Sequence, residues 1–274
     1  MNDIKSMNLY NRIDRIYNEL AELGIGESDP IDVAQLSRFD QLHYHGTEAL
    51  DMAAKLIGAK QGQYWIEIGS GIGGPARYLA DQYKVNMIAL ELQEDQHELA
   101  AALTERCGLS EQVQHYCGDF LDTDWEMGSY EAVVSWLALY HIPERERLLD
   151  KCRALLRPGG YFYAEDLCAL EEIDAAQWRN LERDLSAVTL PEFKDYKRDL
   201  EEAGFIIQHI TDMSADWAEY THQRLQAFRD EHDRHVRVHG AETVAEMDAF
   251  YSAVDEQFQS GKLGGIRICA RTGD

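Results

Sequence analysis

Cysteines are few in this chain, and long apolar runs are absent. The five cysteines, Cys107, Cys117, Cys152, Cys168 and Cys269, show no C-x-x-C spacing. An odd and scattered set predicts reduced thiols rather than a disulfide framework, so we expect a cytoplasmic protein. No apolar run approaches the roughly 18 residues that a membrane span needs. The N-terminal stretch MNDIKSMNLYNRIDRIYNEL is too charged for a signal peptide. We therefore expect no membrane partner.

Positive charge is also scarce. The 274 residues include 26 Lys and Arg against 50 Asp and Glu, which gives a formal net charge of −24. So much negative charge repels phosphate backbones and argues against a nucleic-acid partner. Hydrophobic residues make up 45% of the chain, which is enough for a packed core. The composition predicts a highly soluble globular protein.

From residue 64 onward, short apolar strands alternate with helical segments. The expected strands are residues 64–68, 86–91, 113–117, 130–136, 160–166, 205–211 and 265–271. Helical patterns cover residues 75–83, 95–107 and 144–156 between the first five of them. This alternation predicts a parallel sheet with helices on both faces. Ligands bind such sheets beyond the carboxyl ends of the strands.

Two regions fall outside this alternation. Residues 6–23 carry Leu9, Ile13, Ile16 and Leu20 at helical spacing, and a second helical pattern covers residues 47–57. Residues 214–260 are helical and strongly charged, and we interpret them as an inserted cap. We expect N-terminal helices and a lid over residues 1–58, followed by one domain over residues 59–274 that contains the insert.

The stretch WIEIGSGIGGPARYLA (65–80) predicts a strand, a glycine-rich turn and a helix. Gly69, Gly71 and Gly74 satisfy the G-x-G-x-x-G pattern of dinucleotide-binding turns. The same stretch satisfies E-x-G-x-G-x-G, with Glu67 at its start and Gly73 at its end. The first pattern implies a pyrophosphate and hydride transfer, and the second implies S-adenosylmethionine and methyl transfer. The turn alone leaves both interpretations open.

Acidic residues at the strand ends favour the second interpretation. Glu91 ends the second strand, where a carboxylate accepts hydrogen bonds from ribose hydroxyls in either case. Asp119 follows the third strand and can accept from an adenine amino group, with Phe120 against the ring. Glu67 is a third acid directed at the same ligand. Because burying like charges together is costly, these acids favour a cationic ligand over a phosphate-bearing one. The chain also has no Tyr-x-x-x-Lys pair for hydride chemistry.

Five stretches in this order resemble class I S-adenosylmethionine-dependent methyltransferases. They are IEIGSGIGG (66–74), ALEL (89–92), GDF (118–120), VVSWLALYHI (133–142) and LLRPGG (155–160). The resemblance implies an α/β fold with a Rossmann-like seven-stranded sheet, whose last strand runs antiparallel. It also implies an enzyme, with an N-terminal helical lid and a helical insert before the last strand. A dinucleotide enzyme and a cofactor-binding protein without catalysis are the alternatives.

The resemblance also assigns residues to the cofactor S-adenosyl-L-methionine. The implied cofactor-binding residues are Gln41, Glu67, Gly69, Ser70, Gly71, Gly73, Glu91, Leu92, Gln93, Asp119, Phe120, Trp136 and Leu137.

Two segments are placed to reach the methyl group. One is SWLALYHI (135–142), in which His141 is the candidate base or orienting group. The other is FDQLHYHGT (39–47), which the resemblance identifies as a lid. In the lid, Tyr44 is a second catalytic candidate. The substrate-binding candidates are His43, His45, Tyr140, Trp217 and Arg267.

Within the class, the chain resembles methyltransferases of small polar metabolites, which include glycine/sarcosine and phosphoethanolamine N-methyltransferases. It is most similar to the methyltransferase module of ovothiol biosynthesis, which methylates an imidazole nitrogen of 5-thiohistidine. The supporting stretches are RFDQLHYHGTEALD (38–51), IGSGIGGPARYLA (68–80), SWLALYHIPER (135–145) and FYSAVDEQFQSGKLGGIRI (250–268). The glycine/sarcosine relatives carry a WGGEDIH-type segment in place of FDQLHYHG. The phosphoethanolamine relatives carry an arginine and an acid in place of Trp136 and Leu137.

Two further features bear on ligands. The carboxylate of a zwitterionic acceptor needs a cation, and Arg38, Arg77 and Arg267 lie near the expected strand ends. His232, His235 and His239 share one helical face, and three imidazoles can bind zinc. Because acidic residues surround these histidines, we interpret this face as solvated and expect no metal.

Overall fold

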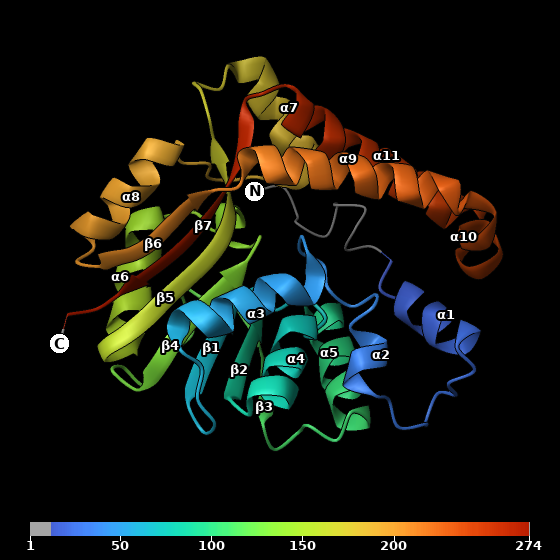
Figure 1. The fold of residues 1–274 in the computed structure, drawn as a ribbon, viewed down its shortest axis with the longest axis horizontal. Helices are drawn as coiled ribbons and strands as arrows, with labels where there is room; N and C mark the ends of the chain where they lie inside the picture. Colours follow the sequence, from blue (N-terminus) through green and yellow to red (C-terminus); the bar gives the residue numbers. More distant parts are fainter. Residues whose placement is uncertain (1–11, 274) are drawn as a thin grey trace.

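The computed structural model describes residues 12–273, which form one seven-stranded sheet with helices around it (Figure 1). The strand order is β3-β2-β1-β4-β5-β7-β6. The strands are β1 (Tyr64–Ile68), β2 (Asn86–Glu91), β3 (Val113–Cys117), β4 (Tyr130–Trp136), β5 (Leu156–Ala169), β6 (Ile206–Asp212) and β7 (Leu263–Arg271). Strand β7 runs antiparallel to both of its neighbours, and the first five strands are parallel. The predicted fold class is therefore confirmed.

The strand predictions agree closely with the structure. Strands β1 to β4 begin and end at the predicted residues. Strand β5 is longer than predicted, because it includes the R-P-G-G stretch (157–160), where the pairing with β4 is irregular. Tyr130 pairs with Leu156 while Ala132 pairs with Tyr161, so extra residues loop out on the β5 side. Gly159 at this point has a positive φ of 71°, which a glycine adopts without strain.

Helices cover both faces of the sheet, and each face has its own apolar core. On one face lie α3 (Gly46–Ile57), α4 (Gly74–Tyr83) and α5 (Glu94–Arg106). On the other lie α6 (Arg145–Leu155) and α8 (Phe193–Glu202). Alanines such as Ala49 and Ala53 bring α3 close to the sheet, whereas leucines such as Leu148 and Leu149 fill the α6 side. This double cover fixes the strand ends at which ligands bind.

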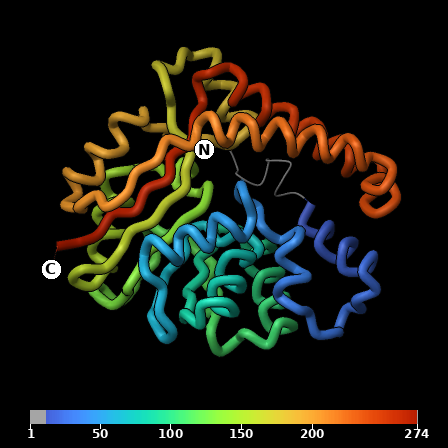
Figure 2. The backbone as a smooth tube through the Cα atoms, in the orientation of Figure 1, coloured from blue at the N-terminus to red at the C-terminus, as the bar shows by residue number. Residues whose placement is uncertain are grey.

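A helical cap lies beyond the carboxyl ends of the strands. It consists of α7 (Ala175–Leu185), α9 (Ser214–Asp230), α10 (His232–His239) and α11 (Ala241–Gln259). Figures 1 and 2 show α9 and α11 running side by side to α10. The helical character predicted for residues 214–260 is confirmed, whereas α7 and α8 were not predicted. A Cβ on Gly265 of β7 would lie 2.0 Å from the Trp217 ring, so glycine is needed for α9 to pack this closely.

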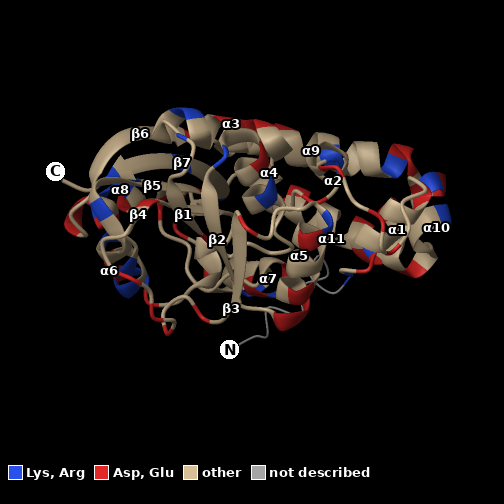
Figure 3. Cartoon of the chain, turned by 90° about the horizontal axis from the view of Figure 1, so that it is seen from below, with Lys and Arg blue, Asp and Glu red and all other residues tan. Residues whose placement is uncertain are grey.

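The N-terminal segment contributes α1 (Arg15–Glu22) and α2 (Val33–Leu36). The predicted helix over residues 6–23 is seen from Arg15 onward, and Leu9 lies outside the described residues. Helix α1 meets α10 through paired charges, since Glu19 contacts Arg234 and Glu22 contacts Arg237. Figure 3 shows acidic and basic positions together at this end of the molecule. Within residues 12–273, no helix has both the length and the apolar character to cross a membrane.

A buried ion pair attaches the N-terminal segment to the sheet domain. The Arg77 side chain of α4 is 0% exposed and donates to Asp40, which is 1% exposed, at 2.9 Å. Arg77 also donates to the carbonyls of Ile72 at 2.7 Å and Ala100 at 3.2 Å. The carbonyl oxygen of Asp40 lies 2.4 Å from where a Cβ on Gly74 would be, so only glycine fits there. These contacts fix the position of the segment that follows Asp40.

We expect Arg77→Met to reduce the free energy of unfolding by about 3–5 kcal/mol, because it leaves the Asp40 carboxylate buried without its cation. Chemical denaturation measures the change. The double variant Asp40→Asn/Arg77→Met should be less destabilised than the single variant, because it removes the unpaired charge. A single variant within about 0.5 kcal/mol of the wild type would contradict this role for the pair.

Candidate active site

A cavity opens at the carboxyl ends of β1, β2 and β4, under the cap. Its volume is about 550 Å³, and we refer to it as the main cavity. The strand ends, the glycine turn after β1 and the segment after Asp40 form one half. Helices α7, α9 and α11 and the loop after α7 contribute Leu185, Ser186, Val188, Arg224, Phe250 and Val254, which we call the cap wall. The location is the one expected for a ligand of a parallel sheet.

The glycine turn lets backbone approach the main cavity closely. Gly69 and Gly71 line the cavity and have positive φ values of 70° and 52°. A Cβ on Gly69 would lie 2.3 Å from that of Ala138, so a side chain there would push the turn away from the end of β4. Gly73 does not line the cavity, because it begins α4 and packs against Arg77 and His115. Its role is to let the helix start beneath the turn.

Three predicted carboxyl groups, Glu67, Glu91 and Asp119, line the main cavity together. Glu91 accepts hydrogen bonds from the backbone N–H of Gly71 at 2.8 Å and of Gln93 at 2.9 Å. Asp119 accepts from the N–H of Leu121 at 2.8 Å, through one oxygen. Glu67 is fully buried in β1. The convergence that the spacing predicted is therefore present.

Burial makes these acids responsive to a positive ligand. Desolvation raises the pKa of Glu67 well above its usual value, and the neighbouring Glu91 raises it further although Arg77 opposes both effects. Desolvation also raises the pKa of Glu91, against the hydrogen bonds from the backbone. A cation in the cavity would favour the ionised form of both groups, whereas a pyrophosphate would add to the unfavourable charge. The site fits a sulfonium and an ammonium group.

The residues at the strand ends therefore suit S-adenosylmethionine. Those that line the main cavity and were assigned to the cofactor are Glu67, Gly69, Ser70, Gly71, Glu91, Leu92, Gln93, Asp119, Phe120, Trp136 and Leu137. Of the other two assigned residues, Gly73 lies behind the turn. Gln41 lines a neighbouring hollow, and its amide donates to Asp40 at 2.7 Å.

The end of β4 turns sharply to form the floor of the main cavity. Leu137 has a positive φ of 54°, which is rare for a leucine and is typical of functional sites. Its N–H donates to the carbonyl of Glu165 on β5 at 2.7 Å, which holds the turn. The turn leads into the 3-10 helix η2 (Leu139–His141). Tyr140 and His141 line the cavity from there.

The predicted catalytic candidates lie in the half of the main cavity next to the cap. His141 contacts the backbone carbonyl of Ser186 through Nδ1 at 3.0 Å. Burial lowers its pKa to about 4, so its imidazole is neutral near pH 7. A neutral ring that donates from Nδ1 keeps its lone pair on Nε2. Tyr44 is buried beside Trp217, with 5.0 Å between ring centroids, and burial raises its pKa to about 12.

The structure separates the substrate-binding candidates into two groups. His43 and Tyr140 line the main cavity. Both ring nitrogens of His43 have partners, the Tyr44 carbonyl and the Gln41 side chain, each at 3.0 Å. His45, Trp217 and Arg267 do not line the cavity.

Each residue of the second group has a partner elsewhere. His45 contacts Asp216 at 2.6 Å, and Trp217 packs between β7 and Tyr44. Arg267 donates to Glu165 at 2.7 Å. With Arg77 also paired, two of the three arginines considered for a substrate carboxylate are bound to acids of this chain.

Residues that the sequence analysis missed come from the cap and the lid. Arg224 of α9 is the only charged residue of the cap wall. A sequence signal for it exists, because no acid lies three or four residues away on α9 and its helical neighbours include Tyr220 and Phe228. Ser186 contributes through its backbone carbonyl, in a left-handed conformation with φ of 50° at the end of α7. No side-chain pattern reveals such a contact.

Comparisons with known proteins agree with this geometry. Residues 34–268 match the family described as mycolic acid cyclopropane synthetase. Sterol 24-C-methyltransferase of Yarrowia lipolytica is 31% identical over 173 residues, which cover 60% of this chain. Sarcosine/dimethylglycine N-methyltransferase of Halorhodospira halochloris is 25% identical over 201 residues, 73% of this chain and 67% of that protein. This chain spans 44% of the length of the Yarrowia protein.

A solved structure shares the fold. Phosphoethanolamine N-methyltransferase 2 of Haemonchus contortus, in complex with S-adenosyl-L-methionine, has a TM-score of 0.78 and 16% identity. The similarity covers 97% of this chain and 60% of that one. The sheet, the glycine turn and the acidic cavity define a class I methyltransferase with S-adenosylmethionine as its cofactor. Because the family match covers most of its length, the chain belongs to the mycolic acid cyclopropane synthetase family.

We expect Glu91→Ala to weaken the binding of S-adenosylhomocysteine by about 1–3 kcal/mol, roughly 5- to 150-fold in Kd, because it removes a buried hydrogen-bond acceptor. Isothermal titration calorimetry measures the change. Glu94→Ala is the matched control, since Glu94 is exposed and three residues away. Equal affinity in Glu91→Ala and the wild type would remove Glu91 from the cofactor site.

We also expect the affinity for S-adenosylmethionine to rise with pH above the usual titration range of a carboxyl group. The raised pKa of Glu67 leaves a fraction of it protonated without ligand, and a bound cation favours ionisation, so binding releases a proton. Calorimetry in buffers of different ionisation enthalpy measures that release. Glu67→Gln should reduce this release, whereas Glu171→Gln, at an exposed site, should leave it unchanged. The same release in wild type and Glu67→Gln would refute the coupling.

Proposed function

We propose that this methyltransferase methylates an imidazole nitrogen of 5-thiohistidine, the methylation step of ovothiol biosynthesis. The proposal rests on one observation, a largely aromatic half-cavity in which His141 carries a hydrogen-bond acceptor. The bound cofactor would supply an electrophilic methyl group. The protein has to hold the acceptor nitrogen in line with that group, exclude water and receive a proton.

The environment of His141 suits proton acceptance from a ring N–H. The carbonyl of Ser186 fixes Nδ1 as the donor, so Nε2 keeps the lone pair. The lowered pKa, about 4, keeps this lone pair available across the physiological range but makes the group a weak base. A weak base is sufficient, because methylation at the lone-pair nitrogen makes the ring cationic and thereby acidifies the N–H of its other nitrogen, whose proton passes to Nε2 of His141. An N-methyl bond forms, a sulfur–methyl bond breaks, and the ring proton leaves.

The rest of the half-cavity suits a flat polar ring. Tyr44, Tyr140 and Phe250 present aromatic surfaces, and Leu137 closes the floor. Rings stack or meet edge to face in such surroundings. Positioning of the two reactants is the largest contribution that a methyltransferase of this kind can make, roughly 7–11 kcal/mol for a well-oriented pair. The cap and the lid provide that positioning from opposite sides.

A second candidate is N-methylation of an acyclic amine. The names of two similar proteins, a sarcosine/dimethylglycine and a phosphoethanolamine N-methyltransferase, support this class of acceptor. The aromatic lining favours the heterocycle over such amines.

The absence of disulfides among the five described cysteines is in keeping with a cytoplasmic setting.

Incubation of the full chain with labelled S-adenosylmethionine and a panel of acceptors tests the function. The panel contains 5-thiohistidine, histidine, sarcosine and phosphoethanolamine. We expect label in 5-thiohistidine, at a ring nitrogen by mass spectrometry of the product. Label only in sarcosine or phosphoethanolamine would establish the second candidate. No label in any acceptor, with cofactor binding intact, would favour a binding protein without catalysis.

We expect His141→Gln to lower kcat by about 10²-fold, the low end for general-base catalysis, because glutamine cannot accept the proton. Its amide can still donate to the Ser186 carbonyl, so the end of α7 should stay in place. Affinity for S-adenosylhomocysteine, measured in parallel, should be unchanged. Wild-type turnover in this variant would exclude His141 as the proton acceptor.

A further inference from the structure

A second hollow adjoins the main cavity on the side of the N-terminal segment. Its volume is about 250 Å³, and we call it the second pocket. It lies between α1, the segment after α2, and helices α9, α10 and α11 of the cap. Leu42, His43 and Arg224 line both hollows, so they form a common wall. A ligand in one pocket is therefore close to a ligand in the other.

The second pocket is basic in a strongly acidic protein. Its lining includes three arginines, Arg15, Arg38 and Arg224, while Glu19 is the one carboxylate among the described residues that line it. The whole chain has 50 acidic residues against 26 basic ones, so this local excess of positive charge runs against the composition. Like charges gathered around a hollow raise the local concentration of ions of opposite sign. The charge of the second pocket favours an anion.

The single carboxylate of the second pocket is already neutralised. Glu19 accepts two hydrogen bonds from Arg234, at 3.0 and 2.6 Å, and one from His239 at 2.9 Å. These bonds, led by that from His239, lower the pKa of Glu19 to about 2 although burial opposes them. Glu19 thus offers little charge to balance Arg38 and Arg224.

Arg224 is held in place without an acidic partner. Its guanidinium lies 4.6 Å from the ring centroid of Tyr251, 5.1 Å from that of Tyr44 and 5.8 Å from that of Tyr220. Its Nε is buried and makes no hydrogen bond, and no carboxylate within residues 12–273 pairs with it. Arg38 is exposed at the rim and forms no ion pair within the same residues. The aromatic rings fix the guanidinium but do not neutralise it.

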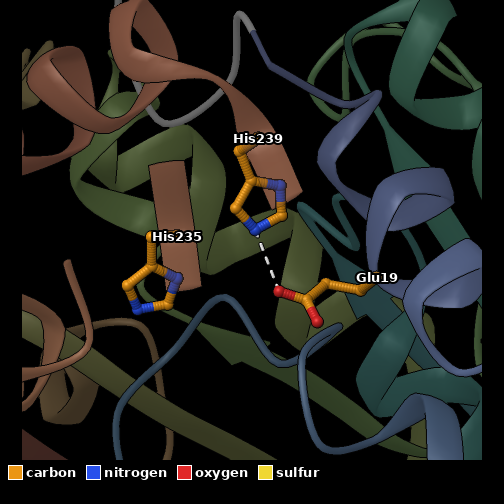
Figure 4. Close-up of side chains that lie close together, drawn as sticks. All are labelled: Glu19, His235 and His239. Atoms are coloured by element: carbon orange, nitrogen blue, oxygen red, sulfur yellow. Dashed lines mark hydrogen bonds and ion pairs between the residues drawn. The ribbon is translucent and has the colours of Figure 1, made fainter. Parts of the chain in front are cut away.

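A metal ion is the alternative occupant of this region. One ligand atom each of Glu19, His235 and His239 lies within 4.8 Å of the others (Figure 4), and such a set can bind zinc. His232, which the sequence grouped with these histidines, is exposed and contacts Asp233 instead. Both oxygens of Glu19 are engaged by cationic groups, however, and the surrounding arginines repel a further cation. The arrangement favours the anion.

We propose that the second pocket binds the carboxylate or phosphate of a small molecule, with Arg224 and Arg38 as its cationic partners. The anionic group belongs either to the methyl acceptor or to a separate small anion. The acceptor can contact Arg224 because this residue lines both hollows. Anion binding itself does not depend on the acceptor proposed above, and only the first of these two sources rests on that function.

Binding of inorganic phosphate to the full chain, without cofactor or acceptor, tests the proposal. Calorimetric titrations at constant ionic strength should give saturable binding that Arg224→Gln and Arg38→Gln each weaken at least tenfold. Arg179→Gln on α7 is the matched control, because it removes the same charge from an exposed site outside both pockets. Arg38 is exposed, so its variant stays informative if Arg224→Gln fails to fold. Absence of phosphate binding, or equal binding in wild type and both pocket variants, would overturn the proposal.

A zinc titration of the same proteins decides against the metal alternative. A zinc site at this cluster would be lost in His235→Ala and kept in His232→Ala. We expect no zinc binding with that pattern. Zinc binding with that pattern, together with phosphate binding that is indifferent to the arginine variants, would assign the region to a metal and overturn the proposal.

Steady-state kinetics distinguishes the two sources of the anion. If the acceptor supplies it, removal of the carboxylate from 5-thiohistidine should raise KM at least tenfold in the wild type and much less in Arg38→Gln, and phosphate should compete with the acceptor. If a separate anion binds, KM should be the same for both acceptors. Either result keeps the anion site. Failure of methyl transfer with every acceptor would reject the proposed function while the phosphate titration still decides on the site.

Discussion

The buried ion pair of Asp40 and Arg77 determines where the N-terminal segment lies, and much of the candidate site follows from that position. Two charges removed from water are tolerated here because Arg77 also donates to the backbone carbonyls of Ile72 in the glycine turn and Ala100 in α5. The pair therefore joins the lid to the turn that approaches the cofactor. Since Leu42, His43 and Tyr44 come directly after Asp40, their places in the main cavity depend on this contact.

Two opposite electrostatic environments share the common wall. In the main cavity, burial keeps the pKa values of Glu67 and Glu91 raised, which is unfavourable for the protein alone and becomes favourable when a cation arrives. In the second pocket, the positive charge of Arg224 has no carboxylate among the described residues to balance it. A cationic cofactor in the main cavity and an anionic group in the second pocket would each meet charge of the opposite sign.

Much of the fold was predictable, because it depends on local patterns. The alternation of apolar residues fixed β1 to β4, and the spacing of Glu67, Glu91 and Asp119 after the strands predicted that they would converge. Helices α7 and α8 were not predicted, although Leu181 and Leu185 of α7 and Tyr196 and Leu200 of α8 are buried at a helical spacing of four residues. The contact of His141 with the Ser186 carbonyl and the meeting of α1 with α10 depend on packing between distant segments. Residue spacing carries no information on such contacts.

The part of the cap formed by α9, α10 and α11 enters and leaves the sheet domain at neighbouring points. It begins after β6 and ends before β7, and these strands pair antiparallel, so Met213 and Gly265 are joined by a backbone hydrogen bond of 2.8 Å. The 51 residues between them behave topologically as one very long hairpin loop, and insertions in such loops cost little closure entropy. A different cap could replace this one without altering the strand ends that hold the nucleoside. Acceptor preference could thus diversify by exchange of a single module while the methyl-donor half stayed fixed.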